Sequence, residues 1–203
     1  MSEYGYIPEA PEQSFGNNKG IFTPKDIYDL TRADKYTNYG QLELIETQTA
    51  SADSSLDFTD LGSYNVHFLT ASLTESTASP NFRVSNDGGS SFISSGYQLA
   101  GQFGSVGGTF GEDKSTSTSI IADFGSGGTG LSKNGYVYFY NLLDSTKYSF
   151  STWHSFSDHS TLTNSFFFGS GVKSTAETHN ALQIRTSGNF TGVVSLYGIK
   201  EYS

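Results

Sequence analysis

The sequence predicts an all-β protein in which a short N-terminal arm precedes one β-sandwich. Composition is the first reason, because the chain has 23 Gly, 16 Phe and 13 Tyr but only 15% charged residues, fewer than the roughly 25% of an average soluble domain. The second reason is that apolar and polar residues alternate with a period of two beyond residue 39. The third is that turn-forming residues separate most of the alternating runs, which is typical of short strands and tight turns.

Residues 1–39 differ from the rest and are predicted to form the arm. Three of the four prolines lie there, and each proline favours an extended conformation of the residue before it. Thr23, Pro24 and Asp26 together are typical of a helix start, as N-cap, first helical residue and acidic residue of the first turn. We therefore expect a mostly extended arm with one short helix at about residues 24–35, and a sandwich over residues 40–203.

The alternating runs after residue 39 predict about eight to ten short strands with no helices between them, which favours a sandwich or barrel. The runs cover residues 42–44, 56–58, 64–69, 82–84, 119–124, 136–140, 147–156, 165–168, 181–185 and 192–200. Asp87, Gly88 and Gly89 predict a tight turn with positive φ. The Gly-rich residues 101–111 are expected to be a crossing loop or an ordered surface loop.

Two of the expected strands are apolar at every position, not only at alternate ones. They are residues 136–140, with the sequence YVYFY, and residues 166–168, with the sequence FFF. In a monomeric sandwich one face of such a strand normally meets water. We therefore expect these strands to mark a subunit interface of a homo-oligomer.

Charge and composition exclude several classes of function. With 11 basic and 20 acidic residues the net charge is −9, the opposite of what phosphate binding needs, so no nucleic-acid partner is expected. No apolar run approaches the roughly 18 residues of a membrane-spanning helix, so no membrane partner is expected either. The chain has no cysteine, which excludes a thiol nucleophile, a Cys-based zinc site and a disulfide framework.

No motif predicts catalysis or a cofactor. Residues 125–130 match G-x-G-x-x-G, but a further strand and not a helix is expected after them, so a phosphate cradle is not predicted. A G-x-S-x-G elbow is missing, and most of the aspartates fall in or beside predicted turns. His154, Asp158 and His159 could hold a metal only if the chain turned between them. We therefore predict a non-enzymatic protein with no catalytic, cofactor-binding or metal-binding residues.

Trp153, His154 and His159 are candidates for contact with a receptor. An amphipathic aromatic ring beside polar loops can stack on a sugar with little loss of entropy. The competing interpretation of Trp153, the only tryptophan, is a residue of the sandwich core or rim.

Several segments resemble a family of jelly-roll-like virion proteins of tailed bacteriophages, common among marine cyanobacterial phages. They are residues 5–11 (GYIPEAP), 20–30 (GIFTPKDIYDL), 40–49 (GQLELIETQT), 56–59 (LDFT), 64–69 (YNVHFL), 83–89 (RVSNDGG) and 192–200 (GVVSLYGIK). The resemblance spans nearly the whole chain, but each piece is short. It implies a jelly-roll-like sandwich on the phage particle, made in the cytoplasm of the host bacterium. Members occur on heads, tails and fibres, and the family supplies no catalytic residues.

The resemblance does not decide between these locations, and the first hypothesis is a capsid decoration or head-surface protein, anchored by its arm to the major capsid protein or to tail and adaptor proteins. The side chains expected to fill pockets on those neighbours are Tyr4, Tyr6, Pro8, Phe15, Ile21 and Phe22. A trimer is common for projecting virion sandwiches. The alternative is the tip of a tail or head fibre that recognises a host surface glycan or protein through residues 101–111, 125–135 and 153–159.

Overall fold

The computed structural model describes residues 13–14, 17–18, 23–33, 42–75, 79–125, 132–159 and 163–201. The chain divides into two compact units, residues 1–41 and residues 42–203. The boundary falls two residues beyond the position that the sequence predicts. The predicted anchoring residues Tyr4, Tyr6, Pro8, Phe15, Ile21 and Phe22 lie outside the described residues.

The N-terminal unit contains the predicted short helix, α1 (Pro24–Arg32), with Thr23 as its N-cap. The Thr23 side chain accepts a hydrogen bond from the Asp26 amide at 3.2 Å, and the Asp26 carboxylate accepts one from the Thr23 amide at 2.8 Å. This reciprocal capping box satisfies two amides at the helix start. The predicted start is confirmed, whereas the helix ends three residues earlier than expected. Strands β1 (Gln13–Ser14) and β2 (Asn17–Asn18) pair antiparallel before it.

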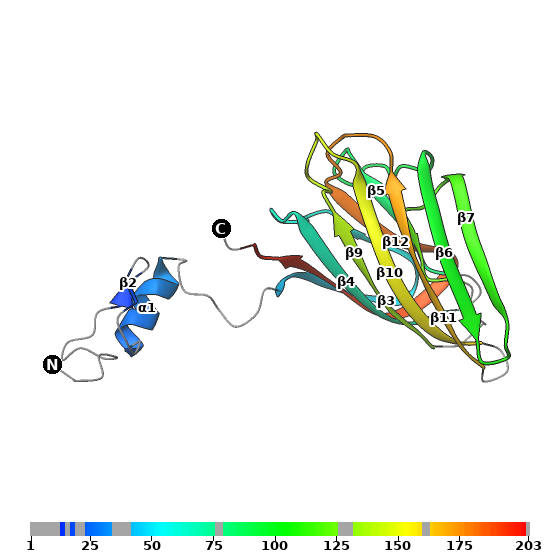
Figure 1. Ribbon diagram of the computed structural model, residues 1–203, viewed down its shortest axis with the longest axis horizontal. Helices are drawn as coiled ribbons and strands as arrows, with labels where there is room; N and C mark the ends of the chain where they lie inside the picture. The colour runs from blue at the N-terminus through cyan, green and yellow to red at the C-terminus, as the bar shows by residue number, and fades with distance from the viewer. Residues whose placement is uncertain are drawn as a thin grey trace. The chain divides into compact units, whose positions relative to one another are not determined.

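The second unit is built from strands alone in the part that the structure describes. They are β3 (Leu42–Phe58), β4 (Val66–Glu75), β5 (Asn81–Ser85), β6 (Tyr97–Ser105), β7 (Phe110–Thr118), β8 (Ala122–Asp123), β9 (Ser132–Tyr140), β10 (Ser149–His159), β11 (Thr163–Lys173) and β12 (Ala181–Ile199). Hydrogen bonds join them in the order β7-β6-β11-β10-β9-β4-β12-β5-β8, and β3 pairs with β12. Figure 1 shows β6, β11, β10, β9 and β4 side by side.

Strand β12 carries the sheet from one layer of the sandwich to the other. Its residues 190–199 pair with β4, and its residues 181–185 pair with β5. β3 accompanies β12 along both parts, with register shifts between residues 185 and 191 of β12 and again between residues 196 and 197. The layers face each other, because the Phe82 ring on β5 lies 5.8 Å from the Phe139 ring on β9 although these strands are not hydrogen-bonded neighbours. All pairings are antiparallel, so the predicted all-β antiparallel sandwich is confirmed.

The core follows from the two-residue alternation. Val137 and Phe139 on β9 are buried between the outward residues of the same strand, and Trp153 on β10 is buried in the same way. Phe124, which follows β8, packs edge-to-face on Phe82 with ring centroids 5.1 Å apart. Burying a side chain of this size contributes about 1.5–3 kcal/mol, so these rings hold the two layers together.

The expectation of a loop over residues 101–111 is wrong, because most of this segment belongs to the β6–β7 hairpin. Glycine normally weakens a strand, but here aromatic rings cover the glycines. A Cβ on Gly104 would lie 2.7–2.8 Å from the rings of Phe166 and Phe110, and one on Gly111 would lie 2.5 Å from the Phe103 ring. The rings pack where a side chain would otherwise stand. At Gly88 and Gly89 the predicted positive φ is confirmed, with values of +75° and +88°.

Candidate functional site

We call the layer formed by β7, β6, β11, β10, β9, β4 and residues 190–199 of β12 the large layer. Its side that faces away from the core carries a continuous set of aromatic rings. Strand alternation and register place them there: Tyr197, Phe68 and Tyr138 are direct neighbours on β12, β4 and β9. The rings of Phe68 and Tyr138 have centroids 4.7 Å apart. We call this surface the aromatic face. Its ring-bearing residues are Phe68, Tyr136, Tyr138, Tyr140, Phe150, His154, Phe156, Phe166, Phe168 and Tyr197.

His154 lies near the middle of the aromatic face. Its register neighbours are Tyr136 on β9 and Phe168 on β11, whose ring centroids lie 5.9 Å and 6.4 Å from that of the imidazole. Phe156, two residues further along β10, is 5.4 Å away. All three neighbouring rings stand nearly perpendicular to the imidazole, at 81–89°, the edge-to-face geometry that aromatic pairs prefer.

The aromatic face is almost free of charge. Among the outward residues of β12 (190–199), β4, β9, β10 and β11 whose side chains the structure describes, only Asp158, near one end of β10, is an acidic or lysine or arginine residue. Phe150, Phe156 and Phe168 are 43–45% exposed. A broad apolar patch of this kind marks an interaction surface, since monomers rarely expose one. The two-faced strands predicted at residues 136–140 and 166–168 both contribute to it.

Trp153 does not belong to the aromatic face, and the prediction that it contacts a receptor is corrected. Its side chain is 3% exposed and packs on Phe167 with ring centroids 6.0 Å apart. The alternation of β10 turns Trp153 inward and His154 outward, so the core interpretation of the tryptophan is the correct one. The side chain of His159 lies outside the described residues.

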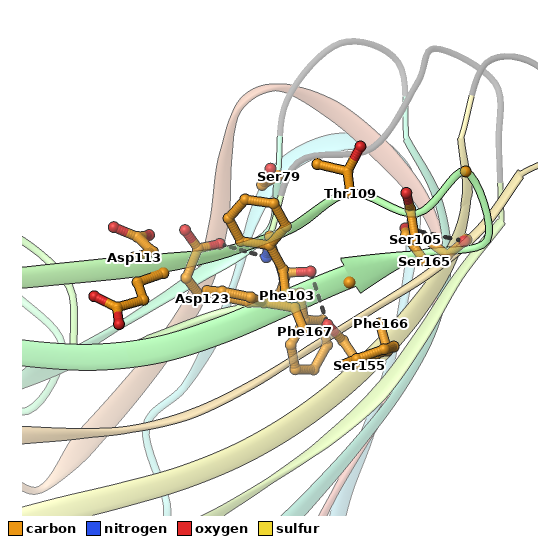
Figure 2. A pocket seen from close by; sticks show the side chains of 16 residues that line it. Ser79, Phe103, Ser105, Thr109, Asp113, Asp123, Ser155, Ser165, Phe166 and Phe167 are labelled. Atoms are coloured by element: carbon orange, nitrogen blue, oxygen red, sulfur yellow. Dashed lines mark hydrogen bonds between the residues drawn. The ribbon is translucent and has the colours of Figure 1, made fainter.

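A second candidate is a pocket of about 670 Å³ at the open edge of the sandwich, shown in Figure 2. Its walls come from β6 and β7 of the large layer, from β8 and the residues after it, and from β10 and β11. The side chains that matter chemically are Phe103, Asp113, Asp123, Ser155, Ser165 and Phe167. No local pattern in the sequence indicates this pocket, because both aspartates fall beside predicted turns and the strands that form its walls are far apart in the chain.

Asp123 is the most perturbed carboxyl group of the pocket. Burial raises its pKa to about 6, and the negative charge of Asp113 acts in the same direction. The Gly125 amide donates to Asp123 Oδ1 at 2.9 Å, and this bond and the positive charge of Lys133 limit the rise. Lys133, itself buried on β9, donates to the Gly125 carbonyl at 2.5 Å. Asp123 therefore changes its charge close to neutral pH.

A Ser–His–Glu line lies elsewhere in the sandwich and was not predicted. The Ser149 hydroxyl lies 2.7 Å from His179 Nδ1, and His179 Nε2 lies 3.3 Å from Glu177 Oε1. Both Ser149 and His179 are 0% exposed, so a substrate cannot reach the hydroxyl. Glu177 also accepts a hydrogen bond from Asn86 at 2.9 Å. These hydrogen bonds join the start of β10 to two loops, so we assign them a structural role.

Neither a metal site nor a membrane-spanning helix has support among the described residues. β10 continues through Asp158 to His159, so the turn that a histidine metal site needs there is not formed. Within the described ranges no three His, Cys, Asp or Glu residues are grouped as a metal site would require. The single described helix is not long and apolar enough to cross a membrane.

Comparison with models of known protein families, with curated proteins and with solved structures gives no match for this chain. The fold therefore defines the class, an antiparallel β-sandwich, and the resemblance to phage virion proteins stays a prediction.

Proposed function

We propose that this protein is a non-enzymatic structural protein on the surface of a phage particle, most specifically a capsid decoration or head-surface protein. In this role residues 1–39 anchor it to the major capsid protein or to tail and adaptor proteins. The resemblance described above supports the proposal, and so does the division of the chain at residue 41. An arm suits anchoring because it covers much surface per residue and can order when it docks.

The observation that carries the proposal is the nearly uncharged aromatic face. Each chain has a net charge of −9, so two copies repel when most of their surfaces approach. On the aromatic face a second copy meets rings and hydroxyl groups with hardly any like charge, and one twofold-symmetric contact would bury both copies of the face. Interface cores are enriched in Tyr and Phe and poor in charged residues. The occupant we propose is therefore another copy of this chain.

The station on the particle is tested by cryo-electron microscopy of intact particles of the phage that encodes the protein. The proposal predicts many copies distributed over the capsid. A truncation that lacks residues 2–22 should keep the cooperative unfolding of the sandwich but lose incorporation. Normal incorporation of the truncated protein would refute the anchor. Absence of the full-length protein from wild-type particles would refute the virion role.

The pocket favours a second function, the tip of a tail or head fibre that recognises a host surface glycan or protein. It lies between the β6–β7 hairpin and the residues that follow β8, which are parts of two segments expected to contact a receptor. A handful of copies at one vertex or at the tail, together with glycan binding by the isolated protein, would favour this function over capsid decoration.

A further inference from the structure

We propose that the pocket at the open edge of the sandwich is a binding site for a neutral saccharide, with Asp113 and Asp123 as hydrogen-bond acceptors and Phe103 and Phe167 as the apolar wall. Its biological role rests on the receptor-binding function proposed above, whereas binding itself can be measured on the isolated protein.

The topology explains why a pocket forms here. β7 and β8 are the two ends of the hydrogen-bonded strand path, so neither has a further strand to close the gap between the layers. Asp113 on β7 is the register partner of Gly101, and its charge acts on Asp123 of β8. In Figure 2 the two aspartates lie at one end of the pocket and Ser105 and Ser165 at the other. Ligand pockets commonly have volumes of about 300–1,000 Å³, a range that includes this one.

The carboxyl groups keep acceptor capacity for a ligand. Asp123 Oδ1 accepts from the Gly125 amide, and within the described residues no hydrogen bond reaches Oδ2. Asp113 is exposed and has no hydrogen-bond partner there either. An ionised carboxylate has about four acceptor sites and no donor. The vicinal hydroxyl groups of a sugar are donors that suit it, and hydrogen bonds to a charged acceptor are the strong ones.

The rings supply the other half of a sugar site. Phe103 and Phe167 are register partners on β6 and β11, and their ring centroids lie 6.4 Å apart. Phe103 is 38% exposed although its strand position faces inward. A sugar ring presents C–H groups on one face and hydroxyl groups at its rim. The C–H face can pack on an aromatic ring while hydroxyl groups reach the carboxylates.

The same lining disfavours other ligands. None of the described residues that line the pocket is basic, and three of them, Glu112, Asp113 and Asp123, are acidic. These carboxyl groups disfavour an anion, although the positive charge of the buried Lys133 acts on Asp123. A calcium ion takes six to eight oxygen ligands, several of them carboxylates, but the three acidic residues of the described lining, Glu112, Asp113 and Asp123, are not grouped as a metal site would require. A neutral polyhydroxylated ligand needs neither a basic counter-charge nor a grouped set of metal ligands.

The test is saturation-transfer NMR on the full chain with glucose, galactose, mannose and N-acetylglucosamine, followed by titration of whichever gives a signal. Calcium chloride, putrescine and sialic acid are run as comparison ligands. Asp123→Asn keeps an oxygen for the Gly125 amide but removes the charge, and Phe103→Ala removes one ring. Their matched controls are Asp158→Asn, on an exposed carboxylate outside the pocket, and Phe110→Ala, on the same hairpin but 74% exposed on the other side.

We expect at least one neutral sugar to bind the wild-type protein and both pocket variants to weaken binding by about tenfold or more, while the two controls change it less than twofold. Thermal unfolding shows whether each variant is folded. Binding of no neutral sugar, binding of calcium or putrescine alone, or equal weakening by pocket and control variants would overturn the site. The location on the particle is measured separately, so failure here leaves the capsid proposal intact.

Discussion

Tyr136 on β9 and His154 on β10 are register partners, and their rings meet edge-to-face with centroids 5.9 Å apart. This pair lies within the aromatic face, whereas the residue before His154 in the chain, Trp153, lies in the core. Two adjacent residues of β10 therefore have different roles. Trp153 stabilises the sandwich, and His154 is available to a partner.

Trp153→Ala and His154→Ala should therefore have very different effects on stability. Removing the buried indole should lower the free energy of unfolding by about 3–5 kcal/mol, because the cavity beside Phe167 cannot be filled. Removing the imidazole should lower it by less than about 1 kcal/mol, because the ring contacts lie at the surface. Urea unfolding of the two purified variants measures both, and similar losses would contradict the assignment of the faces.

Gly171→Ala should destabilise the sandwich because the backbone of Ile121 lies directly against this glycine. An added Cβ on Gly171 would overlap the backbone carbonyl oxygen of Ile121, which also accepts the Ser151 hydroxyl. Overpacking of this kind costs about 1–3 kcal/mol. Gly107→Ala is the control, because its Cβ would meet no atom closer than the Ser105 hydroxyl at 3.7 Å. If the two variants have the same unfolding temperature, the close approach of Ile121 to Gly171 is contradicted.

The structure could be predicted from the sequence where a short segment contains the whole pattern by itself. Residues 136–140 are apolar at every position, which by itself shows that both faces of the strand are apolar, and residues 23–26 contain the whole capping box. The β6–β7 hairpin was missed because Gly101, Gly104 and Gly111 look like loop residues until the rings from β11 and from the hairpin itself are placed over them. Asp113 and Asp123 line the same pocket only because β7 and β8 pack near each other in the folded sandwich. No local sequence pattern predicts that packing.

His67 should make the sandwich less stable in mild acid. Burial lowers the pKa of His67 below its usual 6.5. Nε2 donates to the Leu61 carbonyl at 2.8 Å, and Nδ1 is buried without a partner in the described residues. The unfolded chain binds a proton as the pH falls through about 6.5 while the folded protein resists it, so the free energy of unfolding falls with pH.

The comparison that isolates this effect is His67→Gln, which keeps an N–H donor for Leu61 but does not titrate. Urea unfolding at about pH 7 and about pH 5 should show a smaller loss for the variant than for the wild-type protein. His179 titrates in the same direction and Asp123 in the opposite one, but both are common to the two proteins. An identical loss in both would show that His67 is not responsible.

Saccharide binding at the pocket should depend on pH through Asp123. Its pKa is raised to about 6, so the carboxylate acceptor is present above that pH and is lost as the pH falls through it. Affinity for the bound sugar should decrease over this interval in the wild-type protein. The Asp123→Asn variant should bind weakly at every pH in the interval, and a wild-type affinity that stays constant would argue against a role for this carboxylate.

The claim on which the structural role depends is that the aromatic face joins copies of this chain. Sedimentation equilibrium of the full-length protein measures it most directly. We expect a mass that is a multiple of 21.9 kDa for the wild-type protein and for Ser187→Lys, an exposed position on β12 outside the face. Phe168→Lys should return the mass to that of one chain. A wild-type protein that stays monomeric at every concentration, or a Phe168→Lys variant that assembles normally, would contradict the account.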